Sequence, residues 1–303
     1  MSSLTMVKVT NIWTAVREDP GINCCSEVHI EANLPFRYRV DTAPRLVRVY
    51  VLGATANLPE GKILVRDGLV GQIEVRNYGG QVEVEISLEH RSTADILWTR
   101  PQMPARLTLR FDRQFLRVLF GDKVVVIDPG HGGRDFGYRG PVNLWEKDVV
   151  RHTARRLADI LGRCGSTVVF TRSGDETVSE KRRIACAREN GAHVFVSLHT
   201  HWSANPRVSG PAVLFNPLGP GSEEMASLVS AALVEKVRLR PRRSRADPFL
   251  RLLGPVPGLL VEVVTISDWV EEGLLRSSRF HQKVAEGIFN GLKDYYCKTR
   301  GRG

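Results

Sequence analysis

The segment from Lys123 to Asp148, KVVVIDPGHGGRDFGYRGPVNLWEKD, places the tightest limits on how this chain folds. Its β-branched run Val124–Ile127, followed by Pro and Gly, is typical of a strand buried in an α/β sheet. A glycine-rich turn and a loop lead from that strand into a helix that begins near Glu146. Open α/β sheets bind ligands at the carboxyl ends of such strands, so we expect His131 and Glu146 to lie close together.

A second buried strand, predicted over His193–Leu198, leads directly to His199. Two histidines and one glutamate at strand or helix ends form the three-ligand set of a catalytic zinc site, which leaves one position open. We therefore predict one zinc ion per chain, bound by His131, Glu146 and His199. The alternatives are that His131 caps a turn and that Glu146 interacts favourably with the helix dipole.

Length and composition set wider bounds on the chain. Its 303 residues suggest two domains. No window approaches about 18 uncharged apolar residues, so we expect no transmembrane segment. Five scattered cysteines without CxxC spacing indicate neither a disulfide framework nor a cysteine zinc site. The start of the chain, MSSLTMVKVT, shows no basic segment followed by an apolar one, so no signal peptide is visible.

The formal net charge of +10 falls mainly in the second part of the chain, because residues 1–120 have 15 Lys/Arg against 13 Asp/Glu. The densest basic run is Lys236–Arg245, KVRLRPRRSR, which we interpret as a solvated loop that follows a helix. A basic surface attracts polyanions, and both nucleic acid and an anionic cell wall qualify. The run has no interleaved aromatic residues and no recognised nucleic-acid fold around it, so we expect no nucleic-acid partner.

Residues 1–112 alternate apolar and polar side chains with a period of two. Turn residues interrupt this pattern at Asp19–Gly21, Pro59–Gly61 and Gly79–Gly80. Many short alternating strands predict an all-β sandwich or barrel. No histidines, cysteines or carboxylates cluster here as a catalytic site requires, so we expect this domain to be non-catalytic.

Residues 113–122 are predicted to form a linker, and residues 123–303 a second domain that alternates strands and helices. Such alternation predicts an α/β domain with a mostly parallel sheet flanked by helices. One helix is expected to start with Thr177 as its N-cap, because Glu180 follows three residues later in a capping-box pattern. Further helices are predicted over Ser222–Val237 and Ser278–Tyr296, and a strand over Gly258–Val264.

Five short motifs occur in order across this second domain. They are IDPGHGG (127–133), EKD (146–148), TR with a following Asp (171, 172 and 175), SLH (197–199) and LLVE (259–262). Together they resemble the zinc-dependent N-acetylmuramoyl-L-alanine amidases of the amidase-3 type. The resemblance implies a phosphorylase/hydrolase-like fold and a peptidoglycan hydrolase that cuts the amide bond between N-acetylmuramic acid and L-alanine. It also implies a location at the cell envelope, with any export signal upstream of this chain.

The resemblance also assigns roles to individual residues. Glu262 ends an apolar run, where a charge is costly unless it is used or paired. The family likeness makes it the catalytic residue that activates water, and the alternative is a structural ion pair. His201 stands where the family usually has Asn, and could bind substrate, add a ligand or lie at the surface. Asp148 and Arg172 are expected to support the ligands or to contact substrate.

The first domain resembles the AMIN domain, a β-sandwich module linked to targeting to the cell envelope or its wall polymer. The similar stretch is residues 45–88, an apolar pattern without distinctive chemistry. Two other functions fit the sequence. One is a different zinc peptidase, such as a carboxypeptidase-like enzyme, and the other is a catalytically silent wall-binding protein.

Overall fold

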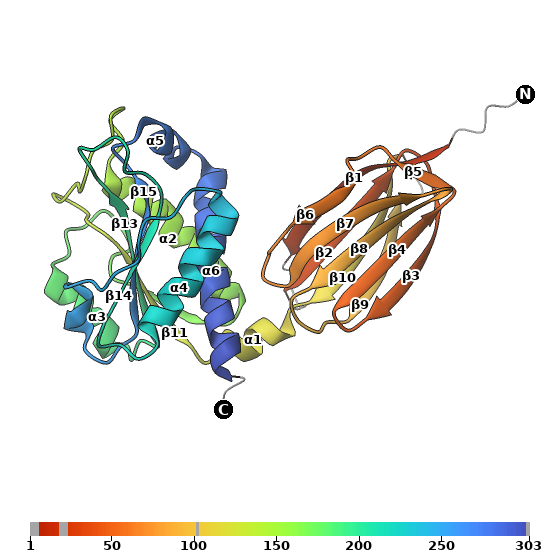
Figure 1. Cartoon of the computed structure of the whole chain (residues 1–303). Helices are drawn as coiled ribbons and strands as arrows, with labels where there is room; N and C mark the ends of the chain where they lie inside the picture. Colours follow the sequence, from red (N-terminus) through yellow and green to blue (C-terminus); the bar gives the residue numbers. More distant parts are fainter. Residues whose placement is uncertain (1–5, 18–23, 101–102, 301–303) are drawn as a thin grey trace, which may run out of the picture. The chain divides into compact units, whose positions relative to one another are not determined.

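The computed structural model describes residues 6–17, 24–100 and 103–300, and it divides into two compact units, Met1–Phe115 and Leu116–Gly303 (Figure 1). The predicted turn Asp19–Gly21 lies outside the described residues. Residues predicted as a linker form helix α1 (Gln114–Phe120) across the boundary between the units. This helix forms because Leu116, Leu119 and Phe120 share one face and are buried.

The first unit consists of two five-stranded sheets with the strand orders β5-β1-β2-β10-β9 and β3-β4-β8-β7-β6. Alternate residues of both sheets, such as Val28 and Val49, share one hydrophobic core, which confirms the predicted β-sandwich. The strands are β1 (Val7–Arg17), β2 (Cys25–Ala32), β3 (Arg37–Ala43), β4 (Leu46–Leu52), β5 (Ala54–Ala56), β6 (Gly61–Leu64), β7 (Val70–Tyr78), β8 (Gln81–Leu88), β9 (Ala94–Arg100) and β10 (Ala105–Asp112).

The second unit is built on a five-stranded sheet with the order β12-β11-β13-β15-β14, in which only β14 is antiparallel to its neighbour among the described strands. The predicted mostly parallel α/β domain is therefore confirmed. Its strands are β11 (Val124–Pro129), β12 (Thr167–Phe170), β13 (Val194–His201), β14 (Ala212–Phe215) and β15 (Gly258–Thr265). Its helices are α2 (Glu146–Arg163), α3 (Glu180–Glu189), α4 (Ser222–Val237), η1 (Leu250–Leu253), α5 (Trp269–Leu275) and α6 (Ser278–Arg300).

The connections of this sheet determine which helix covers which face. From β11 the chain passes through α2 to β12 on one side, then returns through α3 to β13 on the other side of β11. Right-handed crossovers in opposite directions place the two helices on opposite faces. Figure 1 shows α2, α4 and α6 on one face and α3 on the other. The crossover direction reverses between β11 and β13, which is where ligands of open α/β sheets bind.

Two local predictions need correction, and one helix was not predicted. Helix α3 begins after Ser179, whose Oγ accepts a hydrogen bond from Arg182 N at 3.3 Å, so Thr177 is not its N-cap. Thr177 Oγ1 instead accepts from Arg134 N at 3.0 Å. Strand β13 continues to His201, so His199 lies within a strand and not beyond its end. Helix α5 was not predicted, because its sequence WVEEGLL carries two adjacent glutamates.

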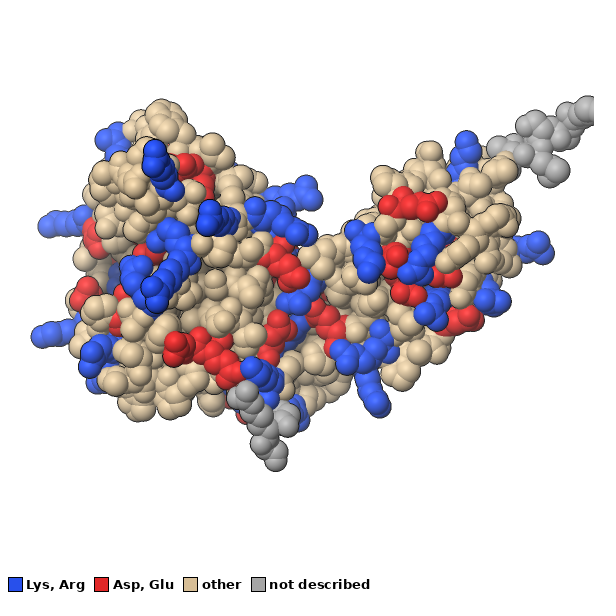
Figure 2. Space-filling model, viewed as in Figure 1, with Lys and Arg blue, Asp and Glu red and all other residues tan. Residues whose placement is uncertain are grey.

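Charged side chains of both signs lie interspersed on the face of each unit that Figure 2 shows. Many are paired, for example Arg39 with Asp41 at 3.4 Å and Arg182 with Glu189 at 2.7 Å. Exposed pairs of this kind contribute little to stability, so the fold depends on its cores. Within the described part of the chain, no helix is long and apolar enough to cross a bilayer.

The close packing of helices α4 and α6 can be tested by a substitution at their contact. A Cβ atom added at Gly291 in α6 would lie 2.2 Å from Val229 Cα of α4. We expect Gly291→Ala to lower the free energy of unfolding by about 1–3 kcal/mol, measured as the urea midpoint. Gly162→Ala is the matched control, since nothing lies within 4 Å of that position in α2. It should be neutral or stabilise by up to about 1 kcal/mol, and equal losses in both variants would contradict this packing.

Candidate metal centre

Three side chains from separate elements converge at the carboxyl edge of the sheet in the second unit. His131 follows β11, Glu146 begins α2 and His199 lies in β13. One ligand atom of each lies within 4.8 Å of the others, and no other group of this kind forms among the described residues. The structure thus brings together the three residues that the sequence singled out.

The carboxylate of Glu146 is the centre of this cluster. It is fully buried, and its Oε2 lies 3.1 Å from His131 Nε2 while its Oε1 lies 3.1 Å from His199 Nδ1. Thr200 N donates to Oε1 at 2.8 Å and Tyr138 N to Oε2 at 2.9 Å. Burial by itself raises the pKa of Glu146, but the hydrogen bonds and charges of His131 and His199 outweigh it and hold this pKa well below its usual range.

This donor set suits a divalent metal ion. Two ligands that are each about 2.0–2.1 Å from a tetrahedral ion lie roughly 3.3 Å apart, close to the 3.1 Å that separates each imidazole nitrogen from the carboxylate. Two imidazoles and one carboxylate are ligands that zinc accepts, and three protein ligands leave a fourth position for water or substrate. The three residues therefore fit a catalytic zinc ion.

Asp135 orients the first of these ligands, and the sequence interpretation missed it. Its carboxylate oxygens lie 2.8 and 2.9 Å from His131 Nδ1, on the opposite side of the ring from Glu146. Such a carboxylate fixes the tautomer and orientation of a metal-binding histidine. The signal was present as an aspartate four residues after the histidine in HGGRD.

Two glycines allow the backbone to approach the ligands closely. A Cβ atom at Gly130 would lie 2.3 Å from His199 Cε1, and one at Gly137 would lie 2.7 Å from Glu146 Oε2. Gly137 and His131 also adopt positive φ values of 66° and 59°. The left-handed conformation is strained for a histidine, and such strain is common at functional sites.

Buried cations hold the loop that carries His131. Arg172 donates to Pro129 O at 2.7 Å and Gly130 O at 2.9 Å, and Arg183 donates to His131 O at 2.7 Å. Arg172 also donates to Gly174 O and Lys147 O, and only 3% of it is exposed. Its contacts are therefore with the main chain that supports the ligands.

Glu262 lies in the same cavity as two of the ligands. Its Oε2 accepts a hydrogen bond from Arg242 Nη2 at 2.6 Å, and its Oε1 lies 3.6 Å from His201 Nδ1. Arg242 belongs to the basic run that was interpreted as a solvated loop, so that interpretation is wrong for this residue. The cavity has a volume of about 430 Å³ and is lined by His131, Gly137, Tyr138, His199, Thr200, Leu214, Arg245, Asp247, Leu260 and Glu262.

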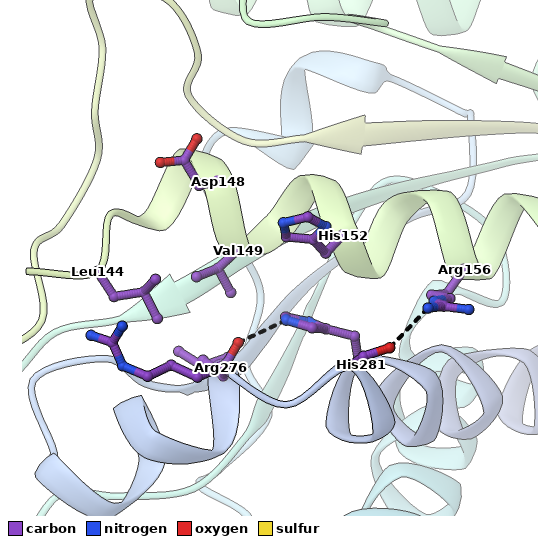
Figure 3. A pocket seen from close by; sticks show the side chains of 9 residues that line it. Leu144, Asp148, Val149, His152, Arg156, Arg276 and His281 are labelled. Carbon is purple, nitrogen blue, oxygen red and sulfur yellow. Dashed lines mark hydrogen bonds between the residues drawn. The ribbon is translucent and has the colours of Figure 1, made fainter.

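Asp148 lies in a different pocket from the metal ligands. This second pocket, of about 360 Å³, lies between α2 and the segment that joins α5 to α6, and its lining includes His152, Arg156 and His281 (Figure 3). Asp148 is in the first turn of α2, where a negative charge interacts favourably with the helix dipole. Asp268 is the N-cap of α5 and accepts from Val270 N and Glu271 N.

Fold and side-chain cluster together define an α/β enzyme with a His–Glu–His metal site at the switch point of its sheet. The family model for N-acetylmuramoyl-L-alanine amidase, Amidase_3, matches residues 125–294, and the chain belongs to this family. It is therefore a peptidoglycan amidase, as the sequence motifs predicted.

Individual relatives agree with this assignment. The N-acetylmuramoyl-L-alanine amidase AmiA of Escherichia coli is 29% identical over 222 residues, which cover 58% of this chain and 77% of AmiA. The solved structure of an N-acetylmuramoyl-L-alanine amidase from Clostridium difficile is 30% identical with a TM-score of 0.56, covering 60% of this chain and all of that one. The amidase AmiC2 of Nostoc punctiforme is 31% identical with a TM-score of 0.55, covering 58% and 98%.

The contact between Asp135 and His131 can be tested by metal binding. Asp135→Asn keeps the size of the side chain but removes the charge that orients the imidazole, so zinc affinity should fall about 10- to 100-fold. Competition with a chromophoric chelator measures this change. Asp159→Asn, an exposed aspartate of α2, is the matched control and should bind zinc as the parent does. Unchanged affinity in Asp135→Asn would remove Asp135 from the site.

Proposed function

We propose that this amidase binds one zinc ion per chain through His131, Glu146 and His199, and cleaves the bond between N-acetylmuramic acid and L-alanine. The observation that carries the proposal is the convergence of these ligands beside Glu262 in one cavity. A bound zinc ion supplies Lewis acidity toward an amide carbonyl and lowers the pKa of water toward about 7. Side chains of this protein are proposed to carry out proton transfer and substrate binding.

Glu262 is the proposed proton carrier. It is 9% exposed, faces the cavity from β15 and is no part of the three-ligand cluster, which is the position that a general base requires. Its carboxylate takes a proton from the attacking water and delivers it to the nitrogen of L-alanine as the amide bond breaks. Arg242 holds Oε2 of Glu262 at 2.6 Å, which leaves Oε1 directed toward His201 and available for proton transfer.

His201 is proposed to bind substrate rather than metal. Its Nδ1 lies 3.6 Å from Oε1 of Glu262, and it is absent from the ligand cluster. Burial and the charge of Arg242 lower the pKa of His201, although Glu262 opposes them. A neutral imidazole can both donate and accept hydrogen bonds, as the usual Asn does.

We infer that residues 1–112 are an AMIN-like, wall-targeting domain and that the protein acts outside the cytoplasm. The family model begins only at residue 125, so the β-sandwich lies outside the matched catalytic part. Among residues 6–17, 24–100 and 103–115, no three potential metal ligands converge. A β-sandwich joined to a peptidoglycan amidase is suited to binding the same polymer.

Glu262→Gln separates proton transfer from metal binding. We expect it to keep about one zinc per chain but to lower kcat by about 10²–10⁴-fold, because a carboxamide cannot accept the proton. Mass spectrometry of digested peptidoglycan, which detects new L-alanine amino ends, measures activity. His131→Ala should instead lose the zinc itself. If Glu262→Gln retained near-normal turnover, another residue would have to be the base.

Removal of residues 1–112 tests the division of labour between the units. This deletion leaves helix α1 complete, whose Phe120 stacks on Phe289 of α6 at 5.3 Å. We expect weaker sedimentation with insoluble peptidoglycan but unchanged kcat/KM on small soluble muropeptides, since the metal ligands all lie after residue 130. Circular dichroism confirms folding. A folded truncation that lost turnover of small substrates would contradict the proposed targeting role.

A further inference from the structure

The basic run Lys236–Arg245 passes beside the catalytic cavity and is anchored there. Helix α4 ends at Val237, and Arg238 turns the chain with a φ of 61°. Arg242 N then donates to Pro211 O at 2.7 Å, and Phe215 N donates to Arg245 O at 3.1 Å. The main chain of this segment is thus fixed against β14, and its side chains project from a defined position.

Two arginines of this run reach the cavity but differ in how they are paired. The guanidinium of Arg242 already has partners within the chain, because its Nε donates to Gly210 O at 3.0 Å and its Nη2 donates to Glu262. Arg245 is exposed and lines the cavity with His131, His199 and Glu262. Within the described part of the chain its guanidinium forms no ion pair or hydrogen bond.

The acidic residues that line the cavity with Arg245 already have other partners. Glu262 accepts from Arg242, and Asp247 Oδ1 accepts from Leu250 N at 3.1 Å. Arg245 is therefore a cation with a fixed backbone and a free guanidinium at the edge of the reaction site. A guanidinium matches the planar, two-oxygen geometry of a carboxylate better than other side chains do.

We propose that Arg245 binds a carboxylate of the stem peptide and makes the amidase prefer acidic stems over amidated ones. This inference rests on the proposed function, which places the scissile amide between the metal ligands and Glu262. The stem peptide starts at that amide, so its first residues are the ones that can contact Arg245 within a cavity of about 430 Å³. The second stem residue is acidic in its unmodified form and neutral at that carboxyl when amidated, which makes it the group that Arg245 discriminates.

Two soluble muramoyl tripeptides that differ only in a carboxylate or carboxamide on the second stem residue test this proposal. The zinc-loaded full chain should show a KM about five- to tenfold lower for the carboxylate form, the range of a partly exposed charged hydrogen bond. Arg245→Gln should raise that KM to the carboxamide value without changing kcat, and Arg245→Lys should recover part of the preference. Arg243→Gln, an exposed neighbour in the same run that does not line the cavity, removes the same charge and should change neither KM.

Direct binding separates this proposal from the catalytic one. Calorimetric titration of both tripeptides into Glu262→Gln, with and without Arg245→Gln, reports recognition without turnover. A carboxylate preference that disappears with Arg245→Gln supports the inference. If Glu262→Gln instead turns the tripeptides over, the proposed base is wrong, and the KM comparison of Arg245→Gln still decides the role of Arg245. Equal affinity of both tripeptides for the unaltered Arg245, or an equal loss for both in Arg245→Gln, would overturn it.

Discussion

The site depends on hydrogen bonds from buried cations to the main-chain carbonyls of the loop Pro129–Gly133. Pro129 ends β11, and the residues after it leave the sheet at its carboxyl edge. These carbonyls therefore need partners outside the regular strand ladder, because unpaired buried carbonyls are costly. Arg172, Arg183 and Lys147 supply those partners. Because these donors come from separate elements, the position of His131 is set by the packing of the whole α/β unit.

Two buried glutamates of helix α5 fix the backbone of segments near the site. Glu272 is fully buried and accepts from Val142 N at 2.7 Å and Leu144 N at 3.1 Å, which fixes the segment that leads into Glu146. Glu271 accepts from Gly210 N and Thr265 N at 2.6 Å each. Burial raises the pKa of Glu271, and the two backbone hydrogen bonds counteract this shift. Buried carboxylates of α5 thus hold the segment that leads into Glu146 and the main chain at Gly210 and Thr265.

The sequence predicted most of the helices and strands because their formation follows local rules. The helix predicted to begin near Glu146 is α2, and Val149, Thr153 and Leu157, which recur in it with helical spacing, are buried. Helix α4 was predicted with its observed bounds, Ser222–Val237. Helix α5 was missed, because its glutamates look exposed in the sequence and become buried only through partners that lie far away in the chain.

The sequence alone predicted the fold class of both units and singled out His131, Glu146 and His199, which the structure brings together, because motifs and periodicity record short-range constraints. Only the tertiary structure decided which cations and acids meet these residues. The pairing of Arg242 with Glu262 joins a loop to a strand 20 residues away, and Asp135 meets His131 only through the left-handed turn at that histidine. Such contacts depend on where separate segments are placed by the packing of the sheet and its helices, and no local pattern of residues encodes that placement.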